Sequence, residues 1–134
     1  MRLWHYKLIP YLPNSQLLAQ WRELNSIFKK QDKHILINYI YEYPQAHLFD
    51  YSCKVTAEMI KRGIKIKNWD NFYNYFDKPT SEYLEVNDPF PNHHNNRYLL
   101  QCFYNLQEKY DRGQKDFTTE QMDKLLNFIK WFDD

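Results

Sequence analysis

Glycine is nearly absent from this chain, with only 2 glycines in 134 residues. Tight turns between strands draw on glycine because it adopts positive φ without steric cost, so its scarcity argues against a turn-rich β-sandwich. It also excludes the glycine-rich phosphate loops of the Rossmann and Walker motifs. A chain of this length fits one compact domain and leaves little room for two.

Aromatic residues supply material for a core. They make up 19% of the chain, as 12 Tyr, 9 Phe and 4 Trp, whereas disordered segments are poor in such residues. The mean hydropathy of −0.83 by itself suggests disorder. Each buried ring, however, removes about 150–250 Å² from water, so we expect a folded chain with a sizeable core.

Apolar residues recur at helical spacing in several segments. The pattern predicts four main helices and one short one, at about residues 15–30, 44–62, 68–76, 95–112 and from 118 onward. Residues 31–43 fit neither period cleanly and are predicted to form a connector with about one helical turn. The predicted fold class is all-α: one compact domain over residues 1–134, with about four helices and long loops.

Helix ends carry local signals of their own. Asn14 or Ser15 is the expected N-cap of the first helix. Thr118 and Gln121 have the spacing of a capping box at the last helix. Two glycines are placed to end the second and third long helices in a left-handed conformation, Gly63 and Gly113.

Charge is distributed unevenly along the chain. Residues 1–67 carry 11 Lys and Arg against 5 Asp and Glu, whereas residues 68–134 carry 7 against 12. The first half is therefore at +6 and the second at −5. This asymmetry indicates one basic face suited to a polyanion, although scattered surface charge would produce the same balance.

The chain lacks the signals of export and membrane insertion. No run approaches the roughly 18–20 apolar residues of a membrane span, and residues 1–7 lack the apolar core of a signal peptide. We expect a cytoplasmic protein without membrane contact, associated with the nucleoid if the cell is bacterial. Cys53 and Cys102 form no C-x-x-C pair and are expected to be free thiols.

Two groups near the start of the chain could carry chemistry. An α-amine has a pKa of about 7.7–8.0 against about 10.4 for lysine, so it is a ready nucleophile for Schiff-base formation. Arg2 is too large to permit removal of the initiator residue, so we expect Met1 to bear this amine. Glu23 lies on the polar side of helix 15–30, one turn after the small Ala19. An ordinary solvated helix face is the alternative interpretation.

Several segments resemble a known family. Residues 17–24 (LLAQWREL), followed by Phe28, resemble the helix that carries the catalytic glutamate and a DNA-contacting arginine in the pyrimidine-dimer DNA glycosylases of the phage endonuclease V type. Lys33 and His34 resemble a Lys-His pair that the family has at the same point of the chain. Residues 49–67 look like the second long helix of that family and the segment that follows it. The opening, residues 1–4, looks like the cellular branch.

The resemblance implies a DNA repair glycosylase that also cleaves abasic sites by β-elimination. By position, the α-amine of Met1 would form a Schiff base with the sugar, and Glu23 would assist ring opening and proton transfer. Further residues would contact DNA, namely Arg2, Arg22, Gln16, Lys33 and His34. The resemblance implies no metal and no organic cofactor. The expected partner is damaged double-stranded DNA, and the expected state is a monomer.

His93 and His94 follow a proline-rich loop before the third long helix. They are candidates for an active-site or DNA-facing loop, and helix capping or solvent exposure is the alternative. Adjacent histidines rarely face one metal ion, so a metal site is not the expectation. Two other functions stay open at this point. One is a non-catalytic helical module that binds nucleic acid or protein, and the other is a metal-dependent nuclease that uses His93 or His94.

Overall fold

The computed structural model describes residues 2–78 and 80–131, and within them every regular element is a helix. The predicted all-α fold class is confirmed. In chain order the elements are η1 (Tyr6–Tyr11), α1 (Asn14–Lys30), η2 (Asn38–Glu42), α2 (Gln45–Lys61), α3 (Trp69–Tyr75), η3 (Thr80–Tyr83), α4 (Asn96–Asp111) and α5 (Thr119–Lys130), where η denotes a 3-10 helix.

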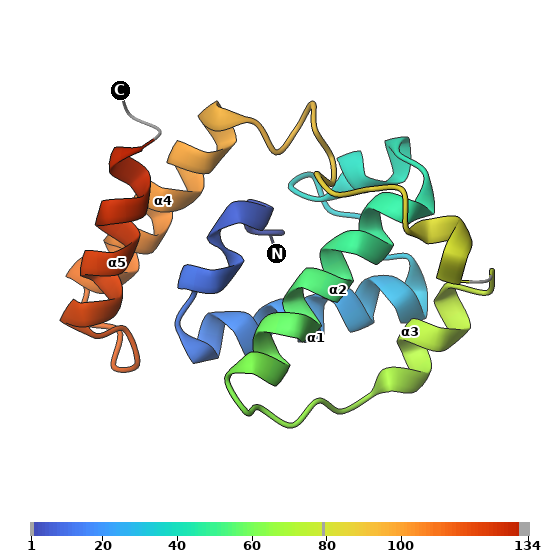
Figure 1. The fold of residues 1–134 in the computed structure, drawn as a ribbon, viewed down its shortest axis with the longest axis horizontal. Helices are drawn as coiled ribbons and strands as arrows, with labels where there is room; N and C mark the ends of the chain where they lie inside the picture. Colours follow the sequence, from blue (N-terminus) through green and yellow to red (C-terminus); the bar gives the residue numbers. More distant parts are fainter. Residues whose placement is uncertain (1, 79, 132–134) are drawn as a thin grey trace.

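The helices form two groups around the start of the chain (Figure 1). α1 packs against α2 and α3, and α4 pairs with α5. η1 lies between these groups and contacts α2, α4 and α5. The buried apolar side chains of all these elements join in one core. The residues of η1 are therefore enclosed by helices from both halves of the sequence.

Local patterns predicted most helix ends correctly. Thr118 accepts from the backbone N–H of Gln121, whose side chain reaches back, so the capping box is confirmed. The two glycines have φ values of 75° and 86°, which confirms the left-handed stops. η2 provides the helical turn predicted within residues 31–43. In contrast, nothing in the sequence pattern predicted η1.

The predicted N-cap of α1 is wrong. Pro13 occupies the N-cap position without a side-chain bond, and both Asn14 and Ser15 lie inside the helix. The cap comes from the α4–α5 loop, where Asp116 accepts from the Ser15 backbone nitrogen at 2.7 Å and from the Ser15 hydroxyl at 3.0 Å. A distant carboxylate thus bonds a free N–H of the first turn and complements the helix dipole.

Two other expectations can be compared with the structure. Cys53 and Cys102 are both free thiols, as predicted. Among residues 2–78 and 80–131, no helix combines the length and the apolar character needed to cross a membrane.

Candidate active site

The segment from Arg2 to His5 has no regular secondary structure, yet Leu3, Trp4 and His5 are buried. An irregular segment can be buried only if its backbone polar groups find partners. Here the partners are side chains of α1, α2 and α4, and the α4 partner is Tyr98, which donates its hydroxyl to the Leu3 carbonyl at 2.6 Å. The start of the chain is thus held in the interior by bonds to three helices.

Gln20 of α1 is the central partner of this segment. Its Oε1 accepts from the Trp4 nitrogen at 2.8 Å, and its Nε2 donates to the Arg2 carbonyl at 3.1 Å. The same Nε2 lies 3.1 Å from Glu23 Oε2. Tyr51 of α2 donates from its hydroxyl to the Trp4 carbonyl at 2.6 Å. The backbone on both sides of Leu3 is therefore fixed relative to α1.

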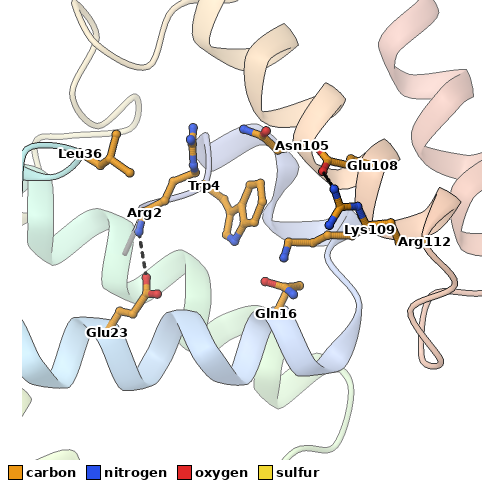
Figure 2. Close-up of a pocket in the computed structure, with 9 residues that line it drawn as sticks. All are labelled: Arg2, Trp4, Gln16, Glu23, Leu36, Asn105, Glu108, Lys109 and Arg112. Carbon is orange, nitrogen blue, oxygen red and sulfur yellow. Dashed lines mark hydrogen bonds and ion pairs between the residues drawn. The ribbon is translucent and has the colours of Figure 1, made fainter.

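Glu23 is half-buried beneath this segment and faces its backbone (Figure 2). The Arg2 backbone nitrogen donates to Glu23 Oε2 over 3.4 Å. Burial raises the pKa of the Glu23 carboxyl, and the N–H groups of Arg2 and Gln20 oppose that rise only in part. A carboxyl with a raised pKa is suited to accept and return a proton near neutral pH.

A cavity of about 390 Å³ opens beside Glu23. Its walls are α1, the N-terminal segment and one face of α4 (Figure 2). The lining is mainly polar or charged and consists of Arg2, Trp4, Gln16, Glu23, Leu36, Asn105, Glu108, Lys109 and Arg112. Glu108 is paired with Arg112 at 2.8 Å. The cavity thus combines three cationic side chains with a half-buried carboxyl.

The family model for pyrimidine dimer DNA glycosylases matches residues 1–71. The chain belongs to that family. This membership confirms the resemblance seen in the sequence and implies a DNA glycosylase that acts in DNA repair on pyrimidine dimers. The matched region spans the N-terminal segment and α1, which supply Arg2, Gln16 and Glu23 to the cavity. Searches of the curated proteins and of the solved structures find no match.

The DNA contacts predicted for this glycosylase-family chain fall into three places. Arg2 and Gln16 line the same cavity as Glu23. Arg22 does not line this cavity. Successive residues of a helix point about 100° apart, so Arg22 leaves α1 in a different direction from Glu23. It is exposed and lines a neighbouring cleft of about 230 Å³ together with Lys29 and Lys30.

Two further predicted residues, Lys33 and His34, do not line the cavity. Lys33 and His34 are exposed on the connector between α1 and η2, and the cavity takes Leu36 from that connector instead. Met1 lies outside the described residues.

The two histidines of the predicted loop have different environments. His94 is buried, and its Nδ1 accepts from the Tyr6 nitrogen at 3.2 Å. In a neutral ring the proton then sits on Nε2, 2.6 Å from the Tyr39 hydroxyl. Burial lowers the pKa of His94 to about 2. His93 is exposed and bonds the Tyr43 hydroxyl at 2.6 Å.

Neither histidine lines the cavity beside Glu23. His94 instead helps to hold the N-terminal segment, because its carbonyl oxygen lies 2.8 Å from His5 Nε2. Across the part of the chain that the structure describes, no group of three or more His, Cys, Asp or Glu side chains could hold a metal ion.

Sequence reasoning missed the contribution of α4. Asn105, Glu108, Lys109 and Arg112 follow one another at steps of three, one and three, so they share one face of a helix. The polar face of the helix predicted at 95–112 was therefore a usable signal. Its position opposite Glu23 was not, since it depends on how α4 packs. Gln20 also had no local signal, because its partners lie up to 31 residues away.

Proposed function

We propose that this protein is a DNA glycosylase with abasic-site lyase activity, in which the α-amine of Met1 is the nucleophile and Glu23 transfers protons. The observation that carries the proposal is the bond between the Arg2 backbone nitrogen and Glu23. Only the carbonyl carbon and the Cα of Met1 separate its α-amine from that nitrogen. The covalent chain therefore keeps the amine within reach of the carboxyl.

The reaction follows from the chemistry of these two groups. The amine nitrogen attacks C1′ of the damaged nucleotide, and the glycosidic bond breaks with its electron pair leaving on the base. The amine then loses a proton while the sugar ring opens and O4′ gains one, which yields an imine between C1′ and Met1. Removal of a C2′ proton expels the 3′ phosphate. Water finally hydrolyses the imine and releases the free amine.

Glu23 is suited to the proton transfers in this sequence. Burial raises the pKa of this carboxyl, so a larger fraction of it carries a proton at a given pH. The protonated form can give that proton to O4′. In the ionised form it accepts the C2′ proton in the elimination step. One group can therefore serve as acid and base in turn.

Cationic side chains around the cavity support binding of the protein to the phosphate backbone of DNA. Arg2, Lys109 and Arg112 line the cavity itself, and Arg22 lies in the adjacent cleft. Arginine forms bidentate contacts with phosphate. Exposed lysines at positions 29, 30 and 33 extend this charge, and His34 and the amide of Gln16 add further polar groups. Binding of DNA is expected to weaken strongly as salt rises.

Borohydride trapping tests the proposal. The protein is incubated with a duplex that contains one abasic site, in the presence of EDTA and borohydride, which reduces the imine to a stable amine. We expect a covalent adduct, and mass spectrometry of its peptides is expected to locate the DNA on Met1. Binding without an adduct would favour the non-catalytic module. Strand cutting that EDTA abolishes, without an adduct, would favour the metal-dependent nuclease.

Gln20 is expected to act as a positioning residue for this chemistry. In Gln20→Glu, one carboxylate oxygen still accepts from Trp4, but the second replaces the nitrogen that lies 3.1 Å from Glu23. Two carboxyls this close do not ionise together, so the pKa of the pair rises. We expect strand scission at neutral pH to fall about tenfold and its pH profile to move upward by about one unit.

The matched control is Gln101→Glu, which adds the same charge on the exposed side of α4, outside the cavity. It should leave the pH profile in place. A profile that does not move in Gln20→Glu would contradict the assigned role, even if the variant were less stable.

A further inference from the structure

The turn between α1 and η2 exposes two apolar side chains beside the cavity. Ile35 is 86% exposed and Leu36 is 40% exposed. Leu36 also lines the cavity with Arg2 and Glu23, on the side of Arg2 away from α4 (Figure 2). A branched aliphatic side chain left in water gives up the free energy of its burial. Two in succession at the edge of a candidate active site point to a partner that covers them.

Hydrogen bonds and one buried side chain hold this turn in shape without a partner. The Ile37 and Asn38 nitrogens donate to the His34 carbonyl at 2.8 and 2.9 Å. The His34 nitrogen donates in return to Asn38 Oδ1 at 2.7 Å. Ile37, next to the two exposed residues, is fully buried and anchors the turn in the core. Insertion of the preformed tip into a partner therefore requires little loss of conformational entropy.

Cationic side chains lie near the apolar tip along the chain and in the cavity. Lys29 and Lys30 are exposed at the end of α1, Lys33 is two residues before Ile35, and Arg2 lies in the cavity. A partner that fits this surface carries negative charge outside and apolar surface inside. Duplex DNA has both, as phosphates along its backbone and stacked bases within.

We propose that Ile35 and Leu36 form a wedge that enters the base stack next to the lesion when the protein binds damaged DNA. The inference rests on the proposed function, since it takes damaged duplex as the partner. Separation of two stacked bases has a free-energy penalty of a few kcal/mol, and this penalty is smallest where a base is missing or distorted. The wedge therefore favours the damaged site over intact duplex, while the cations bind both alike.

Affinity measurements with two duplexes test the wedge. One contains a single tetrahydrofuran residue, an abasic analogue that cannot form a Schiff base, with 2-aminopurine as the neighbouring base. The other is the same sequence intact. In the double variant Ile35→Ala, Leu36→Ala we expect about a tenfold loss of affinity for the tetrahydrofuran duplex and less than about a twofold loss for the intact one. The rise in 2-aminopurine fluorescence that marks unstacking should also disappear.

The matched control is Ile60→Ala, Leu84→Ala, which removes the same two side-chain types at positions that are 64% and 65% exposed and do not line the cavity. It should bind and unstack DNA like the wild type. The wedge is overturned if the Ile35, Leu36 variant keeps the wild-type affinity ratio, or if it loses affinity for both duplexes equally. It is also overturned if the wild-type protein does not prefer the tetrahydrofuran duplex.

The wild-type protein is trapped in parallel with a true abasic duplex and borohydride. An adduct combined with an unchanged affinity ratio would refute the wedge and leave the proposed function intact. Absence of the adduct would refute the proposed function, whatever the affinity ratio of the two duplexes. The two failures are thus told apart.

Discussion

A version of the chain with a short peptide fused ahead of Met1 is expected to form no trapped adduct with abasic DNA. The fusion converts the α-amine of Met1 into an amide, which is not nucleophilic, and moves the new terminal amine away from Glu23. Displacement of a reacting group by about 1 Å can reduce a rate a hundredfold. We therefore expect borohydride trapping to fall by at least about a hundredfold, measured by gel shift of the labelled duplex.

The control for this experiment is the same fusion after a protease has removed the added peptide and restored Met1 as the first residue. Trapping should then return to the level of the unfused chain. An adduct that persists with the fusion in place would move the nucleophile to a side chain. Lys109 would be the first to test, because it is the one lysine among the residues that line the cavity in the described part of the chain.

Glu23→Gln is expected to lower strand scission by at least about a hundredfold, the lower end of the range for loss of a general acid or base. The amide keeps the shape of the side chain and can still accept from the Arg2 nitrogen, but it cannot take up or release a proton at neutral pH. The affinity for abasic duplex should stay within about threefold, because no contact with phosphate is removed. Single-turnover cleavage and filter binding measure the two effects separately.

Glu108→Gln provides the matched control for Glu23. Glu108 lines the same cavity, but it is exposed and paired with Arg112. Its loss removes the same charge from the cavity without removing a half-buried carboxyl, so scission should change by less than about threefold. Near-normal turnover of Glu23→Gln, or an equal loss in both variants, would exclude the role given to Glu23.

The variant Glu23→Gln also tests, through the stability of the fold, whether the pKa of Glu23 is raised. The pKa of Glu23 in the folded chain lies above its value in the unfolded chain, because burial disfavours the charged form. Between the two values the folded chain binds more protons, so the free energy of unfolding falls as the pH rises through that interval. Ionised Glu23 therefore opposes folding at pH 7. Glu23→Gln should melt at a temperature no lower than the wild type at that pH.

Features that depend on neighbours in the chain were predictable. Apolar spacing located the main helices, since each helix buries one stripe of its own residues. The capping box at Thr118 and Gln121 was readable because both bonds close within one turn. Glu23 could be singled out as a candidate from its position on the polar side of its helix and from the resemblance of residues 17–24 to a family that the chain belongs to.

Features that join distant segments were not predictable. Asp116 caps α1 from 101 residues away, and no spacing rule reaches that far. His94 was a candidate for an active-site or DNA-facing loop, but it is buried and accepts a bond from the Tyr6 nitrogen, 88 residues away. The polar face of α4 meets α1 across a cavity only because η1 lies between the two helix groups.

The sequence by itself determined the helices, their stops and the residue types available for chemistry, because periodicity and caps act over a few residues. Only the tertiary structure decided that Arg2 and Glu23 share a cavity and that Arg22 does not. It also decided that Gln20 and Tyr51 hold the start of the chain in the interior. The physical reason is that buried backbone groups must be paired, and the side chains that can pair them depend on the packing of the whole chain.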